Sequence, residues 1–295
     1  MVKYLITDLE RITGIKAHTI RIWEKRYSLL NPNRTDTNIR YYSDDELRRL
    51  LNISLLNKFG YRISSIVKMS DVEINERVLD ITQNTSSYDS CVESLVIAMV
   101  ELNEAKFEKA LSNSILKLGF EKTVISVILP FLEKVGVLWQ AGSINPAHEH
   151  FIANLIRQKL IVAIDSIVPV HSKNAKLFVL FLHSGELHEL VLLFYHYILK
   201  QMGHKILYLG QSVPLSCLHS VCMAQKPDFL LTVITTAMLA ERYVDFINEL
   251  ASMDLARNIF ITGLQTKEHT TKLPANVVRL GSPSNLEEQL TAYLS

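Results

Sequence analysis

The sequence predicts a multidomain protein in three parts: an all-α head, a four-helix bundle, and an α/β domain built on a doubly wound parallel sheet of five strands. Three stretches of different pattern carry this prediction. Residues 1–75 hold short helices and tight turns, residues 88–168 keep a helical apolar period, and in residues 175–295 β-rich runs alternate with helices. We expect domains with these bounds, and a linker in the polar, weakly periodic residues 70–87.

Composition favours a well-packed protein without a membrane segment, since 48% of the residues are hydrophobic and 21% are charged. No apolar run approaches the roughly 18 residues of a membrane span, and Asp8 stands too early for a signal peptide. We therefore expect a cytoplasmic protein with no membrane partner. Cys91, Cys217 and Cys222 are too scattered for a disulfide framework or a structural zinc site, so we expect buried apolar thiols.

Charge is distributed unevenly along the chain, although the formal net charge is only +1. Residues 1–62 hold 12 Lys/Arg against 7 Asp/Glu, whereas the remaining residues hold 19 against 23. A basic N-terminal unit on a slightly acidic body points to a polyanionic partner for that unit alone.

Capping and turn residues predict the elements of the head. Thr7 with Glu10, and Ser43 with Glu46, have the spacing of capping boxes. The stretch 31–38 is rich in Asn, Pro, Asp and Thr, which is typical of a turn or wing. The expected order is a helix at 7–11, a helix at 16–27, the wing at 31–38, a helix at 43–58 and a short helix at 63–69.

The predicted helix at 16–27 has the surface of a recognition helix. Ile20 and Trp23 are spaced to pack inward, which leaves polar and cationic side chains outside. Such a helix can enter a major groove, while wing residues reach the adjacent backbone or minor groove. The candidate DNA contacts are His18, Thr19, Arg21, Lys25, Arg26, Arg34, Arg40 and Tyr41. On these residues alone, a helical hairpin with a solvated basic face remains an alternative.

The N-terminal quarter of the chain closely resembles the MerR-type winged helix-turn-helix family. The resemblance implies that the head binds double-stranded DNA through the candidate contacts. Metal-sensing members continue into a long dimerisation helix with ligand cysteines, a pattern that this sequence lacks, so we do not expect a thiolate metal sensor. The matching motifs are Thr13-Gly14, Thr19-Ile20-Arg21-Ile22-Trp23-Glu24, Arg40-Tyr41-Tyr42 and the Ser43–Glu46 spacing.

The later parts are predicted from apolar periodicity and turn residues. Asn145 before Pro146 is an N-cap followed by proline at the first helical position. The bundle helices are expected near 88–101, 103–118, 121–138 and 146–167. Strands are expected at 177–182, 205–209, 229–234, 258–262 and 277–280, and helices at 187–201, 215–225, 238–252, after 262, and at 284–294.

The loop after the first predicted strand holds His188, with the carboxylate of Glu186 two residues before it. In an open parallel sheet, ligands bind at the carboxyl ends of the strands. A metal-ligating imidazole usually has its second nitrogen held by a carboxylate or carbonyl, which fixes the tautomer. The residues themselves also fit a solvated loop histidine.

A second pattern lies in the bundle, where Trp139 is followed by the pair Glu149 and His150. The tryptophan ends one predicted helix and the pair occupies the first turn of the next. An aromatic plane and a carboxylate could therefore converge on one face. By itself the pattern also fits an interface tryptophan and a capping glutamate.

Together these features resemble, in the same order and over nearly the whole chain, the cobalamin-binding regulators of the CarH/LitR group. Those regulators join a MerR-type head to a helical bundle that acts as a cap and to a Rossmann-like cobalamin-binding domain. The resemblance implies that His188, oriented by Glu186, is the lower cobalt ligand of adenosylcobalamin. It implies that Trp139, Glu149 and His150 cover the upper face. It also implies self-association into a dimer or tetramer, repression, and release by light.

Three positions depart from the family pattern or preserve only part of it. The glycine of E/D-x-H-x-x-G is Val191, whose branched side chain would crowd a close backbone approach to the cofactor. The S-x-L motif is Thr232-Val233-Ile234, which keeps a hydroxyl, and the Gly-Gly pair is Gly263-Leu264. Val191, Thr232 and Gly263 are candidate cofactor contacts around a partly filled pocket for the nucleotide tail.

Three functions remain open at this stage. The first is a repressor that responds to cobalamin and light. The second, which Val191 and Leu264 favour, is a cobalamin-independent MerR-type regulator whose C-terminal domains serve oligomerisation or partner binding. The third is a corrinoid enzyme subunit such as a methyl carrier, against which the DNA-binding head argues. We find no nucleophile elbow, P-loop or HExxH motif, and we do not expect an enzyme.

Overall fold

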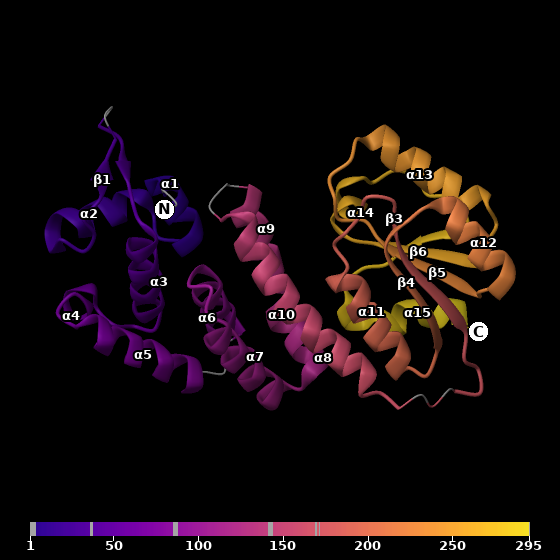
Figure 1. The fold of residues 1–295 in the computed structure, drawn as a ribbon, viewed down its shortest axis with the longest axis horizontal. Coiled ribbons are helices and arrows are strands. Elements are labelled where there is room, and N and C mark those ends of the chain that lie inside the picture. The colour runs from indigo at the N-terminus through magenta and orange to yellow at the C-terminus, as the bar shows by residue number, and fades with distance from the viewer. Residues whose placement is uncertain are drawn as a thin grey trace. The chain divides into compact units, whose positions relative to one another are not determined.

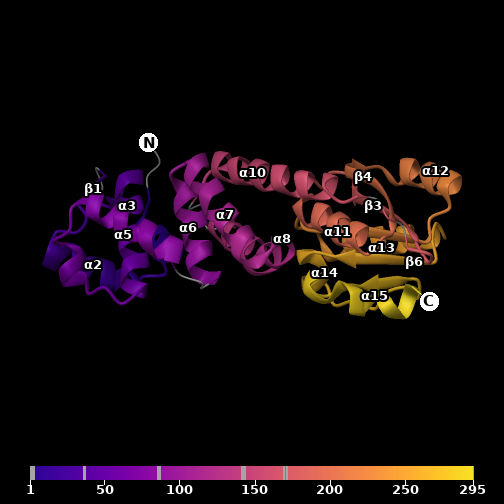
Figure 2. The same cartoon turned by 90° about the horizontal axis from the view of Figure 1, so that it is seen from below.

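The computed structural model describes residues 4–35, 38–84, 88–140, 144–168, 170 and 172–294 of the 295-residue chain. The chain divides into two compact units, Met1–Leu155 and Ile156–Ser295, and each is described by itself. Unit 1 contains helices and a two-stranded hairpin, and unit 2 is a layered α/β structure (Figures 1 and 2). Within the described residues, no helix combines the length and apolar character that a membrane crossing requires.

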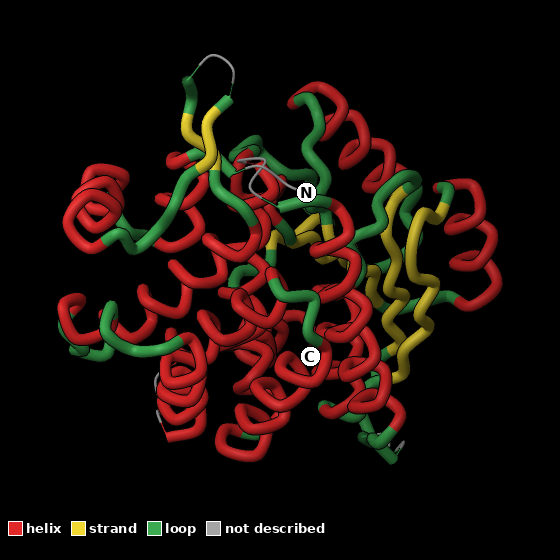
Figure 3. The backbone as a smooth tube through the Cα atoms, turned by 60° about the vertical axis from the view of Figure 1, so that its left-hand side comes forward, coloured by secondary structure: helices red, strands yellow, loops and turns green. Residues whose placement is uncertain are grey.

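The N-terminal head has the predicted order of short helices and a wing. Gly14, with φ of 74°, ends the first helix in a left-handed turn. Ser43 and Glu46 form the predicted capping box, because each backbone N–H donates to the other side chain, at 2.8 and 3.3 Å. The β1–β2 hairpin projects from the helices (Figure 3). The elements are α1 (Ile6–Thr13), α2 (Ala17–Tyr27), β1 (Asn33–Arg34), β2 (Arg40–Tyr41), α3 (Asp44–Lys58) and α4 (Ile63–Ile66).

The predicted helix cap at Thr7 is wrong. Leu5 is the N-cap of α1, and its N–H donates to the Asp8 carboxylate at 2.7 Å. Glu10 instead accepts from the N–H of Ala17 at 3.0 Å, across the turn between α1 and α2. Leu5 with Asp8, and Thr7 with Glu10, both place a carboxylate three residues after a possible N-cap. The helix begins at the earlier of the two pairs.

The predicted linker at 70–87 is wrong as well, because Asp71–Asn84 form a helix, α5. Ser70 caps it, exchanging hydrogen bonds with the carboxylate and the N–H three residues on. Ile74 and Val78, one helical turn apart, are only 2% and 8% exposed. These buried side chains let α5 pack on α3 and on the next helix of unit 1, α6 (Tyr88–Val100).

The bundle region follows the predicted helices, with one irregularity. The helix expected at 121–138 contains a π-helical turn, η1, which ends two residues before Pro130. Proline has no N–H to donate and clashes with the carbonyl four residues earlier, which a wider turn relieves. Phe107 packs on Phe131, with ring centroids 5.9 Å apart, and Asn145 Oδ1 caps the last helix. The elements are α6 (Tyr88–Val100), α7 (Glu104–Leu118), α8 (Phe120–Thr123), η1 (Val124–Ile128), α9 (Leu129–Gln140) and α10 (Pro146–Asp165).

Unit 2 contains the predicted five-stranded parallel sheet, in the order β4-β3-β5-β6-β7. Because β3 lies between β4 and β5, the strand order reverses there, and the carboxyl ends of β3 and β5 flank the switch point. The strands are β3 (Leu177–His183), β4 (Lys205–Val213), β5 (Phe229–Val233), β6 (Asn258–Thr262) and β7 (Val277–Arg279). The helices are α11 (Leu190–Gln201), α12 (Leu215–Gln225), α13 (Ala240–Ser252), α14 (Leu264–Glu268) and α15 (Leu286–Leu294), which the 3₁₀ turn η2 (Pro283–Asn285) precedes.

Helices cover both faces of this sheet, α12 and α13 on one and α11 and α15 on the other (Figure 1). On the first face, Val179 and Leu230 share a buried cluster with Ile247 of α13. On the second face, Phe260 meets Tyr293 of α15 edge-on at 5.4 Å. Burial on both faces explains why the strands are almost continuously apolar rather than alternating.

Candidate DNA-binding surface and ligand-binding loop

Helix α2 presents the predicted DNA contacts to solvent. Ile20 and Trp23 are buried against the head, at 0% and 9% exposure. The opposite faces of α2 and the wing therefore carry an open array of cations and hydrogen-bonding groups. The exposed candidates are His18, Arg21, Lys25, Arg26, Arg34 and Arg40, and the partly exposed ones are Thr19 and Tyr41.

The wing is a short antiparallel hairpin that places Arg34 directly opposite Arg40. The Arg34 guanidinium donates to Asn38 Oδ1 at 2.6 Å, which holds this side chain against the hairpin. Two cations on adjacent strands suit contacts with a phosphate backbone. Their role in DNA binding stays a prediction.

Glu24 joins the recognition helix to the wing, a role that sequence analysis did not assign to it. Its carboxylate accepts from Arg40 Nε at 3.2 Å and from the Tyr42 hydroxyl at 3.0 Å. Burial, together with the Glu24 charge, raises the pKa of Tyr42, which therefore remains a donor at physiological pH. Both partners lie in the family motifs, but a pairing across 16 residues is invisible in the sequence.

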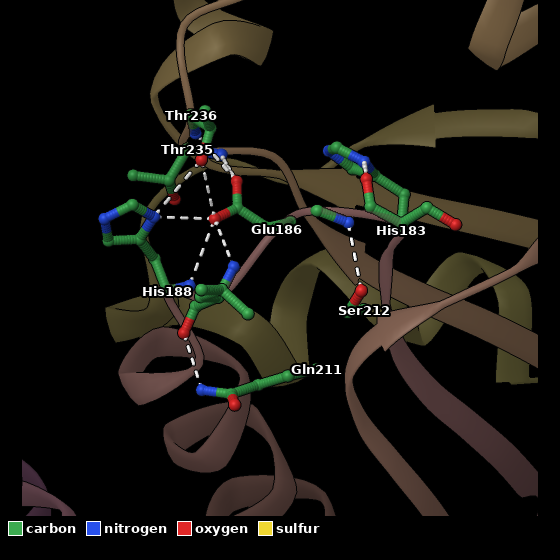
Figure 4. Close-up of polar contacts among 10 residues, drawn as sticks. His183, Glu186, His188, Gln211, Ser212, Thr235 and Thr236 are labelled. Carbon is green, nitrogen blue, oxygen red and sulfur yellow. Dashed lines mark hydrogen bonds and ion pairs between the residues drawn. The ribbon is translucent and has the colours of Figure 1, made fainter.

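The loop between β3 and α11 is organised around Glu186, which is 0% exposed. Its Oε1 lies 2.6 Å from His188 Nδ1 and accepts the Thr236 hydroxyl at 2.9 Å. Its Oε2 accepts the N–H groups of Thr235 and Thr236 at 2.8 and 2.7 Å (Figure 4). The carboxylate thus connects the loop after β3 to the loop after β5.

These hydrogen bonds decide the charge of the pair. Burial would raise the pKa of Glu186, but donors from His188, Thr236 and Thr235 outweigh it and hold that pKa well below its usual range. An ionised carboxylate favours the proton on Nδ1 of His188. The other ring nitrogen lies on the side away from Glu186, and the side chain is 51% exposed (Figure 4). The imidazole therefore has the orientation that is usual for metal-ligating histidines, with one ring nitrogen held by a carboxylate and the other turned away from it.

The remaining candidates of unit 2 lie at the same end of the sheet, and they differ in how well they suit contact with a cofactor. Thr232 is 0% exposed, and its hydroxyl has no partner among the described residues. Gly263 has φ of 108°, and a Cβ there would lie 2.4 Å from the carbonyl oxygen of Ile234. The fold itself therefore requires this glycine. Val191 is partly exposed in the first turn of α11, and Leu264 is 44% exposed.

The bundle candidates lie at two helix ends of unit 1. Trp139 is the penultimate residue of α9 and is 44% exposed. Glu149 is partly exposed and His150 exposed in the first turns of α10. The His188 loop belongs to unit 2, so a common cofactor for both sets stays a prediction.

Residues 4–72 match the family model of MerR HTH family regulatory proteins, and residues 92–163 match that of the B12 binding domain. The chain is 24% identical to the HTH-type transcriptional repressor CarH of Myxococcus xanthus over 273 residues, which cover 90% of each protein. It is 26% identical to the repressor CarA of the same organism over 266 residues, 90% of this chain and 88% of CarA. The chain is homologous to both repressors.

The chain also shares its fold with a corrinoid protein of known structure. The corrinoid protein for monomethylamine from Methanosarcina barkeri is similar in structure, with a TM-score of 0.51 and 17% sequence identity. The match covers 70% of this chain and 99% of that protein. At this identity it shows a shared fold only. The CarH and CarA homologies support a regulator rather than an enzyme, and the B12-domain match supports a cobalamin cofactor.

The three cysteines of this chain do not all have the predicted burial. Cys222 is buried, and burial raises the pKa of its thiol to about 11. Cys91 is partly exposed and Cys217 is exposed, so the expectation of three buried thiols is wrong. Cys217 lies in the first turn of α12, whose inward side chains are Leu218 and Cys222. Among the described residues, no group of three or more His, Cys, Asp or Glu side chains is arranged to hold a metal ion.

Proposed function

We propose that this chain is a MerR-type transcriptional repressor whose DNA binding and self-association respond to adenosylcobalamin and to light. The observation that carries the proposal is the Glu186–His188 pair. A buried carboxylate lies 2.6 Å from one imidazole nitrogen and so orients the ring, at the carboxyl end of a parallel sheet. The MerR-type head and the homology to two repressors support the idea that ligand binding at this loop controls DNA binding.

The residues present fit a corrinoid in their donor chemistry. His188 would supply an imidazole nitrogen to cobalt, and the unpartnered, fully buried hydroxyl of Thr232 offers a hydrogen bond to a ligand. Trp139, Glu149 and His150 would contact the upper axial group. When bound, adenosylcobalamin supplies a cobalt–carbon bond that light breaks.

The head supplies the affinity for DNA. Exposed cations on α2 and the wing would neutralise phosphates, and Thr19 and Arg21 would reach base edges. Two or more heads held in one assembly multiply a modest affinity per head, so a ligand that changes self-association also changes operator occupancy.

The test is to load the full chain with adenosylcobalamin in the dark and record three quantities before and after green light. These are the absorption spectrum, the mass by size-exclusion chromatography with light scattering, and the affinity for DNA selected from a random library. We expect a coloured protein, a larger assembly in the dark, and weaker DNA binding after illumination. His188→Ala should weaken corrin retention after illumination, whereas His219→Ala, at an exposed position of α12, should not. A colourless wild-type protein would refute the cobalamin response.

A second function is favoured by the packing around Gly263. The backbone of Ile234 fills the space beside Gly263, and Leu264 and Val191 replace the glycines of the family pattern. A cobalamin-independent regulator would use its C-terminal domains for oligomerisation or partner binding. It would bind DNA with an affinity and an assembly state that neither cobalamin nor light changes.

A further inference from the structure

The His188 loop is tied to the edge of the sheet as well as to the loop after β5. Gln211 Nε2 donates to the carbonyl of Leu187 at 2.7 Å, and the N–H of Gly185 donates to Ser212 Oγ at 3.1 Å (Figure 4). Both partners come from the end of β4. These contacts tie the loop to β4, while Glu189, at its C-terminal end, is held by Arg157 of α10 as well as by Tyr208 of β4.

Each carboxylate oxygen of Glu189 has a partner. Glu189 is the N-cap of α11, and its side chain is only 14% exposed. Its Oε1 lies 2.9 Å from Arg157 Nε of α10, and its Oε2 accepts the Tyr208 hydroxyl at 2.9 Å. Gly210 leaves room for this arrangement, since a Cβ there would lie 3.3 Å from the Tyr208 ring. The His196 ring stacks on the Tyr208 ring, with the two centroids 5.3 Å apart.

The C-terminal half of α10 runs beside α11 within unit 2. Arg157 pairs with Glu189 at the start of α11, and Lys200, in its last turn, donates to the carbonyl of Ile164 at 2.8 Å. The two helices therefore run in the same direction and are joined at both ends of α11. The first turns of the same α10 helix carry Glu149 and His150.

We infer that Arg157 is a positioning residue for His188, acting through Glu189 so that the place of the imidazole depends on helix α10. This inference rests on the proposed function, in which the position of His188 matters because His188 ligates cobalt. Removing the cation leaves a largely buried carboxylate without its counter-charge, which is costly, so Glu189 would turn toward water and release the start of α11. The loop between the two glutamates would loosen with it.

The ligand-free protein provides the first readout. The N–H groups of Leu187 and His188 both donate to Glu186, so their hydrogen exchange reports the order of the loop. Arg157→Met keeps the aliphatic stem and removes the charge. We expect about ten-fold faster exchange at these two amides, which corresponds to about 1.4 kcal/mol. Amides of β5 should exchange at the wild-type rate.

Two variants separate positioning from general packing. Lys200→Met removes a second contact between α10 and α11, at the far end of α11, and should leave the two loop amides unchanged. Arg157→Lys retains a cation and should restore most of their protection. If Arg157→Met does not fold, Glu189→Gln removes the same ion pair while keeping an acceptor for Tyr208, and it should give the same loosening.

The loaded protein provides the second readout. After illumination, Arg157→Met should retain corrin about ten-fold less tightly than wild type, whereas Lys200→Met should match wild type. Loop amides that exchange at the wild-type rate in folded Arg157→Met and Glu189→Gln would overturn the inference. A wild-type protein that binds no corrin would instead overturn the proposed function, and the exchange measurement would still decide the role of Arg157 in the loop.

Discussion

At the scale of single residues, Glu186 shows how a fully buried carboxylate can be kept charged. Every oxygen accepts at least two hydrogen bonds, from backbone and side-chain donors of two loops. The energetic cost of burying the charge is offset by charge-assisted bonds, which are about twice as strong as neutral ones. The same bonds orient His188, so the stability and the ligand geometry of the loop have one source.

Glu186→Gln should therefore destabilise the chain by about 2 kcal/mol at pH 7, because an amide cannot accept from all these donors. The folded-state pKa of Glu186 lies below its ordinary value of 4.5, so its contribution is complete above that pH and is lost as the pH falls. Urea denaturation of wild type and variant at pH 7 and pH 4 checks this expectation. A difference in stability that grows on acidification would contradict it.

Lys25 illustrates the residue scale on the DNA side. It is exposed on α2, at the position where the MerR resemblance implies a DNA contact. If it pairs with a phosphate, Lys25→Ala should weaken binding alike for all sequences and reduce the slope of log affinity against log salt by about 1. Fluorescence anisotropy over a salt series measures this slope. Lys122→Ala, at an exposed position of α8, is the control and should leave the slope unchanged.

At the scale of elements, α5 is the clearest difference between expectation and structure. Its polar composition suggested a linker, yet Ile74 is only 2% exposed. Ile74→Ala should cost about 2–4 kcal/mol of unfolding free energy, since it removes buried methyl groups and leaves a cavity. Val72→Ala on the same helix, 67% exposed, should cost under about 0.5 kcal/mol. Chemical denaturation of both variants distinguishes a packed helix from a linker, in which neither change would matter.

A second connection between elements is made by Glu93 of α6. Its Oε1 lies 2.7 Å from Lys58 Nζ of α3 and 2.8 Å from Lys134 Nζ of α9, and its side chain is 15% exposed. One carboxylate thus joins the head to α9, the helix that carries Trp139. Burial opposes ionisation, but the bonds to Lys134 and Lys58 prevail and lower the pKa of Glu93.

Glu93→Gln should destabilise unit 1 by about 1–3 kcal/mol at neutral pH, because two ammonium groups then face each other without a counter-charge. Since the folded-state pKa is lowered, the stabilisation is present above the ordinary value of 4.5 and fades as the pH falls below it. Thermal unfolding of wild type and variant at pH 7 and pH 4 is the measurement. Equal stabilities at pH 7 would show that the network contributes nothing.

At the scale of the whole molecule, the sequence predicted the order of architectures and the strands of the sheet, because buried parallel strands and amphipathic helices have strong apolar periods. It missed α5, whose helical signal is two buried residues in a polar segment. The pairing of Glu186 with His188 was expected from their spacing. Thr236 and Arg157 could not be found in the same way, because each meets its carboxylate only through the fold, 50 and 32 positions away.

The carboxylate shared by α3, α6 and α9 also bears on protein engineering. A DNA-binding module excised after Met69 would carry Lys58 without its counter-ion and would leave behind α5 and α6, which both pack on α3. Chimeras that graft this head onto another sensor should therefore be joined beyond Val100, so that α6 travels with it.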